Sequence, residues 1–135
     1  RCCGMKLLLD THIWVWSVSD PNRVTGKARD ALLSADNPRW LSPISVWEAM
    51  HLLEKGRISF VRDAPSLIRE ALRLSHVVEA PLTHEIAMES RRLLRFHGDP
   101  ADRFLVATAR VLDLALVTAD RQILKSRACT VVAND

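Results

Sequence analysis

Four acidic residues stand where the expected strands and helices of this chain begin or turn, and no other set of side chains in it is better placed for chemistry. They are Asp10, Glu48, Asp102 and Asp120. Asp10 closes the apolar run 5–9, and Asp120 closes the apolar run 114–119. Because the carboxyl ends of parallel strands line the ligand crevice of an α/β sheet, we expect these acids to meet there.

Carboxylates gathered in this way repel one another, so the cluster is tolerated only where protons or cations neutralise it. The four acids offer only oxygen atoms, which are the ligands that Mg²⁺ and Mn²⁺ prefer. The five histidines show no metal-ligand spacing such as H-E-x-x-H. The pattern therefore predicts a Mg²⁺ or Mn²⁺ site that acts on phosphate groups.

Three of the four acids also have a structural interpretation as helix caps. Asp10 and Asp120 could each cap the helix that follows, a common use of aspartate. Asp99 and Asp102 have the spacing of a capping box around Pro100, and a carboxylate at this position favours the helix dipole. Capping uses only some of the lone pairs of a carboxylate, so a cap can also bind a metal ion.

Glu48 and two neighbours of the acids have more open interpretations. Ser45, Glu48 and His51 form a polar line on an otherwise apolar helix, and this line faces either water or a polar cleft. Arg103 could hold a phosphate oxygen or pair with a neighbouring acid. Thr118 could add its hydroxyl to the site or pack against it.

Strands and helices alternate through most of the chain. We expect strands at 6–9, 39–41, 77–78, 114–118 and 130–133, and helices at 11–17, 26–35, 43–55, 64–75, 84–96, 100–112 and 121–126, with a turn at 20–22. This alternation predicts an α/β fold, a three-layer α/β/α sandwich around a central, mostly parallel sheet.

Composition bounds the class of protein. The 135 residues suggest one domain over residues 5–135, with residues 1–4 as an upstream extension or a cloning remnant. We expect no secretory signal, and the sequence contains no apolar run of membrane-spanning length. The three cysteines form no C-x-x-C pair, which favours a reducing, cytoplasmic setting. The net charge of +3 is mild, and the basic residues of the C-terminal half could attract nucleic acid or simply be solvated.

Four segments together resemble a known family. Leu-Leu-Leu-Asp10-Thr11-His, Ser-Val-Trp-Glu48, Gly-Asp-Pro-Ala-Asp102-Arg103 and Leu-Val-Thr-Ala-Asp120 occur in the order seen in PIN-domain ribonucleases. More narrowly, the chain resembles the VapC toxins of type II toxin–antitoxin systems. The D-P-x-D-R and T-x-D elements are the more specific ones, and L-D-T alone would be weak.

The resemblance implies a Mg²⁺-dependent (or Mn²⁺-dependent) endoribonuclease that acts as a toxin and leaves a 3′-hydroxyl. It implies that Asp10, Glu48, Asp102 and Asp120 form the catalytic, metal-binding site. The accessory residues expected beside them are Asp99, Thr118, Arg103 and Thr11.

The expected partners are an RNA substrate, a VapB-type antitoxin and a second copy of the chain. The helices that contain Trp14 and Pro43 hold more apolar residues than one packed face needs, which suggests a partner surface. Two alternatives stay open: a housekeeping RNA-processing nuclease of the same fold, and a non-catalytic interaction module whose acids are only helix caps.

Overall fold

The computed structural model describes residues 4–56, 63–93, 96 and 98–135. Its helices and strands follow in the order β1 (Leu7–Leu9), α1 (Thr11–Ser19), the 3₁₀ helix η1 (Pro21–Arg23), α2 (Gly26–Leu33), β2 (Arg39–Leu41), α3 (Pro43–Gly56), α4 (Ala64–Ser75), β3 (Val78–Glu79), α5 (His84–Arg91), α6 (Pro100–Leu112), β4 (Ala115–Thr118), α7 (Arg121–Ser126) and β5 (Val131–Ala133).

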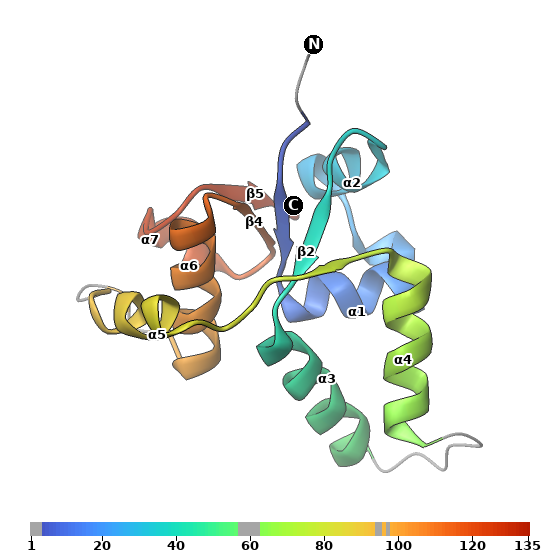
Figure 1. The fold of residues 1–135 in the computed structure, drawn as a ribbon. Coiled ribbons are helices and arrows are strands. Elements are labelled where there is room, and N and C mark those ends of the chain that lie inside the picture. The colour runs from blue at the N-terminus through green and yellow to red at the C-terminus, as the bar shows by residue number, and fades with distance from the viewer. Residues whose placement is uncertain (1–3, 57–62, 94–95, 97) are drawn as a thin grey trace.

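The five strands form one parallel sheet in the order β3-β2-β1-β4-β5. Leu8 of β1 pairs with Trp40 of β2 on one side and with Leu116 of β4 on the other. The central strands β1 and β4 are buried along their whole length, which explains why both are continuous apolar runs. Helices lie on both sides of the sheet, with α1, α2 and α4 on one side and α5, α6 and α7 on the other, so the predicted three-layer fold is confirmed (Figure 1).

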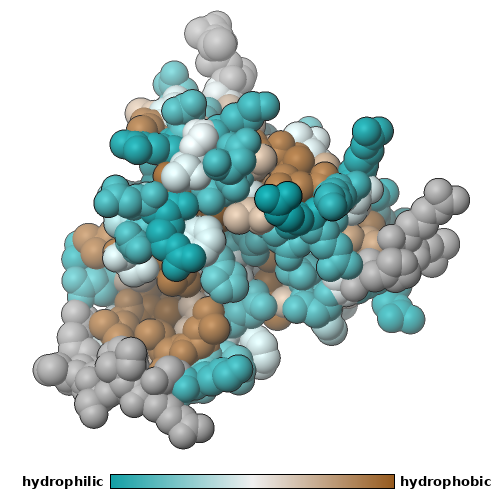
Figure 2. Space-filling view, turned by 180° about the vertical axis from the view of Figure 1, so that it is seen from behind, coloured by the Kyte–Doolittle hydropathy of each residue, from teal (hydrophilic) through white to brown (hydrophobic). Residues whose placement is uncertain are grey.

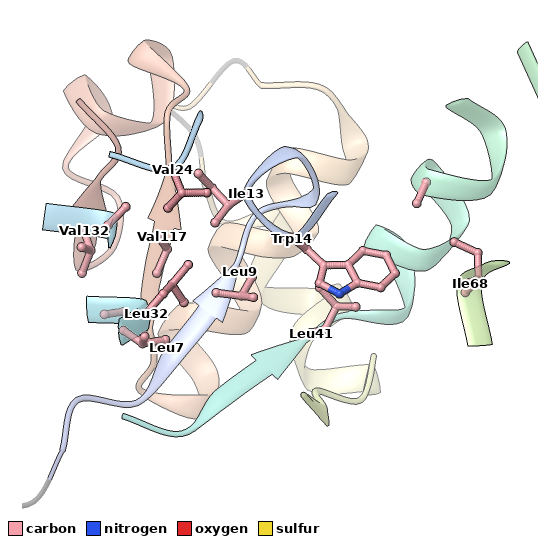
Figure 3. Close-up of a cluster of buried hydrophobic side chains, with 13 residues drawn as sticks. Leu7, Leu9, Ile13, Trp14, Val24, Leu32, Leu41, Ile68, Val117 and Val132 are labelled. Atoms are coloured by element: carbon pink, nitrogen blue, oxygen red, sulfur yellow. The ribbon is translucent and has the colours of Figure 1, made fainter. Parts of the chain in front are cut away.

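Alternate residues of β1 enter two different hydrophobic cores, as the period of a strand requires. Leu7 and Leu9 pack with Trp14 of α1 and with residues of α2, α3 and α4 (Figure 3). Leu8 points the other way and packs with Leu105 of α6 and Ile123 of α7. The sheet therefore holds its carboxyl edge rigidly between two packed layers, and the candidate site lies along that edge.

Two expected elements need correction. The helix expected over 84–96 ends at Arg91, and the chain then turns so that Leu93 and Phe96 are buried against the second core. The strand expected at 77–78 is β3, one residue later. The predicted turn at 20–22 is the 3₁₀ helix η1. None of the helices in the described ranges has the length and apolar character that a membrane crossing requires.

Candidate active site

The acidic site lies at the point where the order of the strands in the sheet reverses. From β1 the chain first builds β2 and β3 on one side, and later adds β4 and β5 on the other. Asp10 follows β1 directly and Asp120 comes two residues after β4, so both stand at the carboxyl ends of adjacent parallel strands. The backbone N–H of Asp10 donates to the carbonyl of Val117 at 3.0 Å, which ties the two strand ends together. Ligands of open α/β sheets bind at this kind of switch point.

Asp10 is buried, with 8% of its surface exposed, and both of its carboxylate oxygens are engaged. Oδ1 accepts from the backbone N–H of Thr11 at 2.7 Å, which caps α1, and Oδ2 accepts from the hydroxyl of Thr118 at 2.6 Å. The Thr118 hydroxyl also accepts from the backbone N–H of Asp120 at 3.0 Å. Burial raises the pKa of Asp10, and the hydrogen bonds from Thr118 and Thr11 offset part of that rise.

Glu48 reaches the same place from α3. Its Oε1 lies 2.5 Å from the Thr11 hydroxyl, which also lies 3.0 Å from the hydroxyl of Ser45. Ser42 starts this helix, because its hydroxyl accepts from the backbone N–H of Ile44 at 3.1 Å. The polar line on α3 therefore faces a polar cleft at Ser45 and Glu48, and the third member, His51, instead stacks outside on Trp47.

Asp99 and Asp102 come from the amino end of α6. Asp99 caps the helix, since its Oδ1 accepts from the backbone N–H of Asp102 at 2.8 Å. Gly98 precedes the cap because the space is tight: a Cβ there would collide with the Phe96 ring and lie 3.0 Å from the Cβ of Asp102. The capping interpretation of Asp99 is thus confirmed, and the side chain of Asp102 remains directed to the site.

Arg103 binds backbone carbonyls and is not among the residues that line the acidic site. Its guanidinium donates to the carbonyl of Phe96 at 2.5 Å and to the carbonyl of Ser90 at 2.7 Å. The structure thus shows a role for Arg103 that the sequence did not suggest, and phosphate binding by Arg103 stays an untested prediction. Arg103 fixes the chain between α5 and α6, and so sets the position of the helix that holds Asp102.

The acids interact through space even where they make no direct contact. Burial raises the pKa of Asp102 to about 7, and the nearby carboxylates add to the rise. These carboxylates are, in decreasing order of effect, those of Asp99, Asp10, Asp120 and Glu48. One depression of about 400 Å³ contains them all; it is lined by Asp10, His12, Trp16, Glu48, Asp99, Asp102, Ala119 and Asp120.

This fold and this cluster of acids can be compared with known proteins. The profile of the PIN domain matches residues 7–128. The chain belongs to the PIN-domain family. It is 33% identical, over 90% of its length and 92% of the relative's, to Ribonuclease VapC22 of Mycobacterium tuberculosis (strain ATCC 25618 / H37Rv), which places this PIN domain among the VapC-type proteins.

Solved structures agree on the fold of this PIN domain. VapBC2 from Rickettsia felis, bound to a DNA fragment from the promoter, matches with a TM-score of 0.72 at 16% identity, covering 97% of this chain and 100% of that one. A toxin–antitoxin complex from Klebsiella pneumoniae matches with a TM-score of 0.70 at 22% identity, covering 96% and 98%. At these identities the likeness concerns the architecture alone.

The acids of this PIN domain suit a divalent metal ion by chemistry rather than by present geometry. Within the described ranges, no three acids, histidines or cysteines stand close enough together to hold an ion. Oδ1 of Asp120 is occupied by the backbone N–H groups of Gln122 and Ile123. The oxygen-only donor set still fits Mg²⁺ or Mn²⁺.

Sequence reasoning missed two residues of this depression. His12 and Trp16 line it from α1, with ring centroids 5.8 Å apart. Neither residue is among the site residues that the sequence predicts. Their spacing of four residues, directly after the strand-end acid Asp10, places both on the helix face that Asp10 begins, and this spacing could have identified them.

Proposed function

We propose that this VapC-type PIN domain is a Mg²⁺-dependent or Mn²⁺-dependent endoribonuclease that acts as the toxin of a toxin–antitoxin pair. The observation that carries the proposal is the depression at the strand ends, which five carboxylates line and where the pKa of Asp102 is raised to about 7. A site that crowded with acids needs a cation to be stable when ionised. The relative named as a ribonuclease supports RNA as the substrate.

The position of each residue suggests its role in the reaction. Asp10, Asp102 and Asp120 would hold the ion, and a bound divalent cation supplies the charge that lowers the pKa of a water molecule and offsets charge on the scissile phosphate. Thr118 and Thr11 keep the Asp10 carboxylate oriented. Glu48, held by Thr11, would orient the attacking water or act as a further ligand.

The experiment that tests this function is an RNA cleavage assay with purified protein. We expect cleavage of single-stranded RNA with Mg²⁺ or Mn²⁺, loss of cleavage in EDTA, and recovery when the metal is restored. The Asp10→Asn variant, purified in parallel, controls for contaminating nuclease. Robust cleavage in EDTA by the native protein, absent from the variant, would refute the metal dependence; no cleavage of any RNA would favour the non-catalytic alternative.

An apolar groove on the side of the sheet covered by α1 and α4 supports an antitoxin as partner. The groove has a volume of about 420 Å³ and lies between α1, α3 and α4, with Val18, Leu52 and Leu74 exposed along it. Figure 2 shows a hollow apolar patch at the lower left of this face, with hydrophilic surface above it and to its right. We propose that the C-terminal segment of a VapB-type antitoxin binds there, because two walls of the groove, α1 and α3, also lead to Asp10 and Glu48.

Charge explains how such a segment would inhibit. A basic side chain that reaches the acidic depression from the groove would displace or repel the metal ion. We expect the neighbouring small protein to co-purify and to suppress cleavage. The Leu52→Asp and Leu74→Asp variants should be suppressed less by the small protein than the native enzyme is. Leu33→Asp should be suppressed as fully as the native enzyme, since Leu33 is 72% exposed on α2 and outside the groove. Equal suppression of all variants would exclude this groove.

A second apolar surface supports a homodimer. Trp47 is 64% exposed and borders a depression of about 540 Å³ that also contains Leu82 and Phe104, directly beside Glu48 and Asp99. We propose that a second copy of the chain covers this surface. Sedimentation should show a dimer that Trp47→Glu converts to a monomer and Leu33→Glu does not. A native monomer would contradict the proposal.

The cytoplasmic setting expected from the cysteines stays a prediction.

A further inference from the structure

The acidic depression has a cationic rim on one side. Trp16 of α1 lines the depression, and the guanidinium carbon of Arg23, from η1, lies 4.4 Å from the centre of the Trp16 ring. This distance is typical of a cation–π contact. Arg23 itself is exposed. A positive charge is therefore held at the edge of a strongly negative site.

The contact with the Trp16 ring positions Arg23 without using the N–H groups of its guanidinium. A guanidinium that lies on an indole uses its flat face, so its N–H groups remain free to bind a phosphate with two parallel hydrogen bonds. The backbone of Arg23 is fixed as well: its N–H donates to the carbonyl of Asp20 at 3.0 Å, and its carbonyl accepts from the side-chain amide of Asn134 at 3.1 Å. Within the described part of the chain, no ion pair engages its guanidinium.

Two arginines of α6, Arg103 and Arg110, are already engaged within the protein. Arg103 donates to two backbone carbonyls, and Arg110 pairs with Glu89 at 2.8 Å. An RNA strand that approaches five carboxylates is repelled unless cations meet its phosphates. Arg23 carries a guanidinium and is held at the rim by a residue that lines the depression, so it can meet this requirement.

We propose that Arg23, oriented by Trp16, binds a backbone phosphate of the RNA next to the scissile one and so positions the strand in the acidic depression. This inference rests on the proposed nuclease function. Trp16 is a positioning residue, because it acts through the guanidinium that it supports. Arg23 binds the substrate and takes no part in the proton transfers.

The first test compares Arg23→Ala with a matched control, Arg69→Ala, which removes an exposed arginine of α4 that does not line the depression. Arg23→Ala should raise KM about tenfold, the effect of one charge-assisted hydrogen-bonded contact, with kcat changed much less. Arg69→Ala should match the native enzyme. An unchanged KM in Arg23→Ala, or an equal rise in both variants, would overturn the proposal.

Salt dependence separates a phosphate contact from a structural role. The slope of log K against log salt for single-stranded RNA should become less steep by about 0.7 in Arg23→Ala, since one phosphate contact is lost. Arg23→Lys keeps the charge, so it should keep the native slope while losing part of the affinity. A native slope in Arg23→Ala with a lowered melting temperature would mean that Arg23 only stabilises the fold, and would refute the proposal.

A double-mutant cycle tests the role of Trp16. If Trp16 acts through Arg23, then Trp16→Leu raises KM in the native background and adds little to Arg23→Ala. Additive effects would show that Trp16 contacts the RNA by itself and would overturn its positioning role. Binding is measured by titrating labelled RNA in EDTA as well, so the Arg23 contact can be judged even if no RNA is cleaved and the proposed function fails.

Discussion

The two walls of the acidic depression hold their carboxylates in different ways. On the strand wall, formed by Asp10, Thr118 and Asp120, both oxygens of Asp10 accept hydrogen bonds and the side chains are linked across β1 and β4. On the helix wall, formed by Asp99 and Asp102, Asp99 is used as a cap and its neighbour Asp102 has a pKa raised to about 7. On the strand wall, hydrogen bonds from the protein stabilise the carboxylate of Asp10. On the helix wall, burial and the neighbouring carboxylates oppose the charge of Asp102.

This difference indicates which side of the site adapts. The strand wall is built by the same contacts that join the two central strands, so its carboxylate is oriented before any ligand arrives. The helix wall places a carboxylate beside four others, and only protons or cations can offset that repulsion. We infer that the strand wall provides the geometry of the site, and that the raised pKa of Asp102, caused first by burial and then by the neighbouring carboxylates, adds to its need for a cation.

The largest effect is expected from removing one acid of either wall. Asp10→Asn and Asp102→Asn should each abolish RNA cleavage, because the remaining acids hold the cation poorly. Both should remain folded, since each change also relieves carboxylate repulsion. Asp102→Asn should raise the metal-free melting temperature at neutral pH or leave it unchanged. Cleavage assays and thermal unfolding check this prediction; full activity in both variants would mean that the acids are only caps.

A smaller effect is expected from loosening the strand wall without removing a charge. Thr118→Val should destabilise the fold by about 1–3 kcal/mol, because a buried donor to Asp10 is lost, and should lower cleavage about tenfold. Thr118→Ser keeps the hydroxyl and should therefore retain native stability and native cleavage.

Thr108→Val is the matched control for this change. Thr108 is equally buried, yet its hydroxyl donates to a backbone carbonyl of its own helix at 2.7 Å. Cleavage by Thr108→Val should therefore equal that of the native protein. A Thr118→Val variant with native activity would show that the hydrogen bond to Asp10 has no functional role.

The smallest effect is a pH dependence of stability that belongs to the helix wall. The pKa of Asp102 is about 7 in the folded protein and 3.8 ordinarily, so the folded state holds the extra proton between these values. Metal-free stability should therefore fall as pH rises from about 4 to 7 and level off above. Asp102→Asn should remove this part of the decline, as measured by melting temperature against pH. Parallel curves for native and variant protein would contradict the raised pKa.

Much of the fold, and the strand-end and helix-start positions of Asp10, Asp102 and Asp120, could be predicted from local sequence signals, whereas only the family resemblance put Glu48 beside them. The apolar run Leu7–Leu9 became β1, and the Asp99–Pro100 pair became the cap and first residue of α6. These signals act within one turn of helix or one strand, so the printed order of residues suffices to recognise them.

The contacts that sequence reasoning could not predict join residues distant in the chain. Thr11 reaches Glu48 across 37 positions, and Arg103 ends α5 early by binding carbonyls of the preceding segment. The Trp16–Arg23 contact likewise depends on how η1 folds back on α1. Such contacts depend on tertiary packing, and no local pattern encodes them.

The most direct test of the account is a calorimetric titration of the metal-free protein with Mn²⁺ or Mg²⁺ at a pH above the pKa of Asp102. The account predicts saturable binding by the native protein, and loss of binding in both Asp10→Asn and Asp102→Asn, because the two walls close on one ion. Glu54→Gln, which removes an exposed acid of α3 outside the depression, should bind as the native protein does. No saturable binding, or undiminished binding by Asp102→Asn, would contradict it.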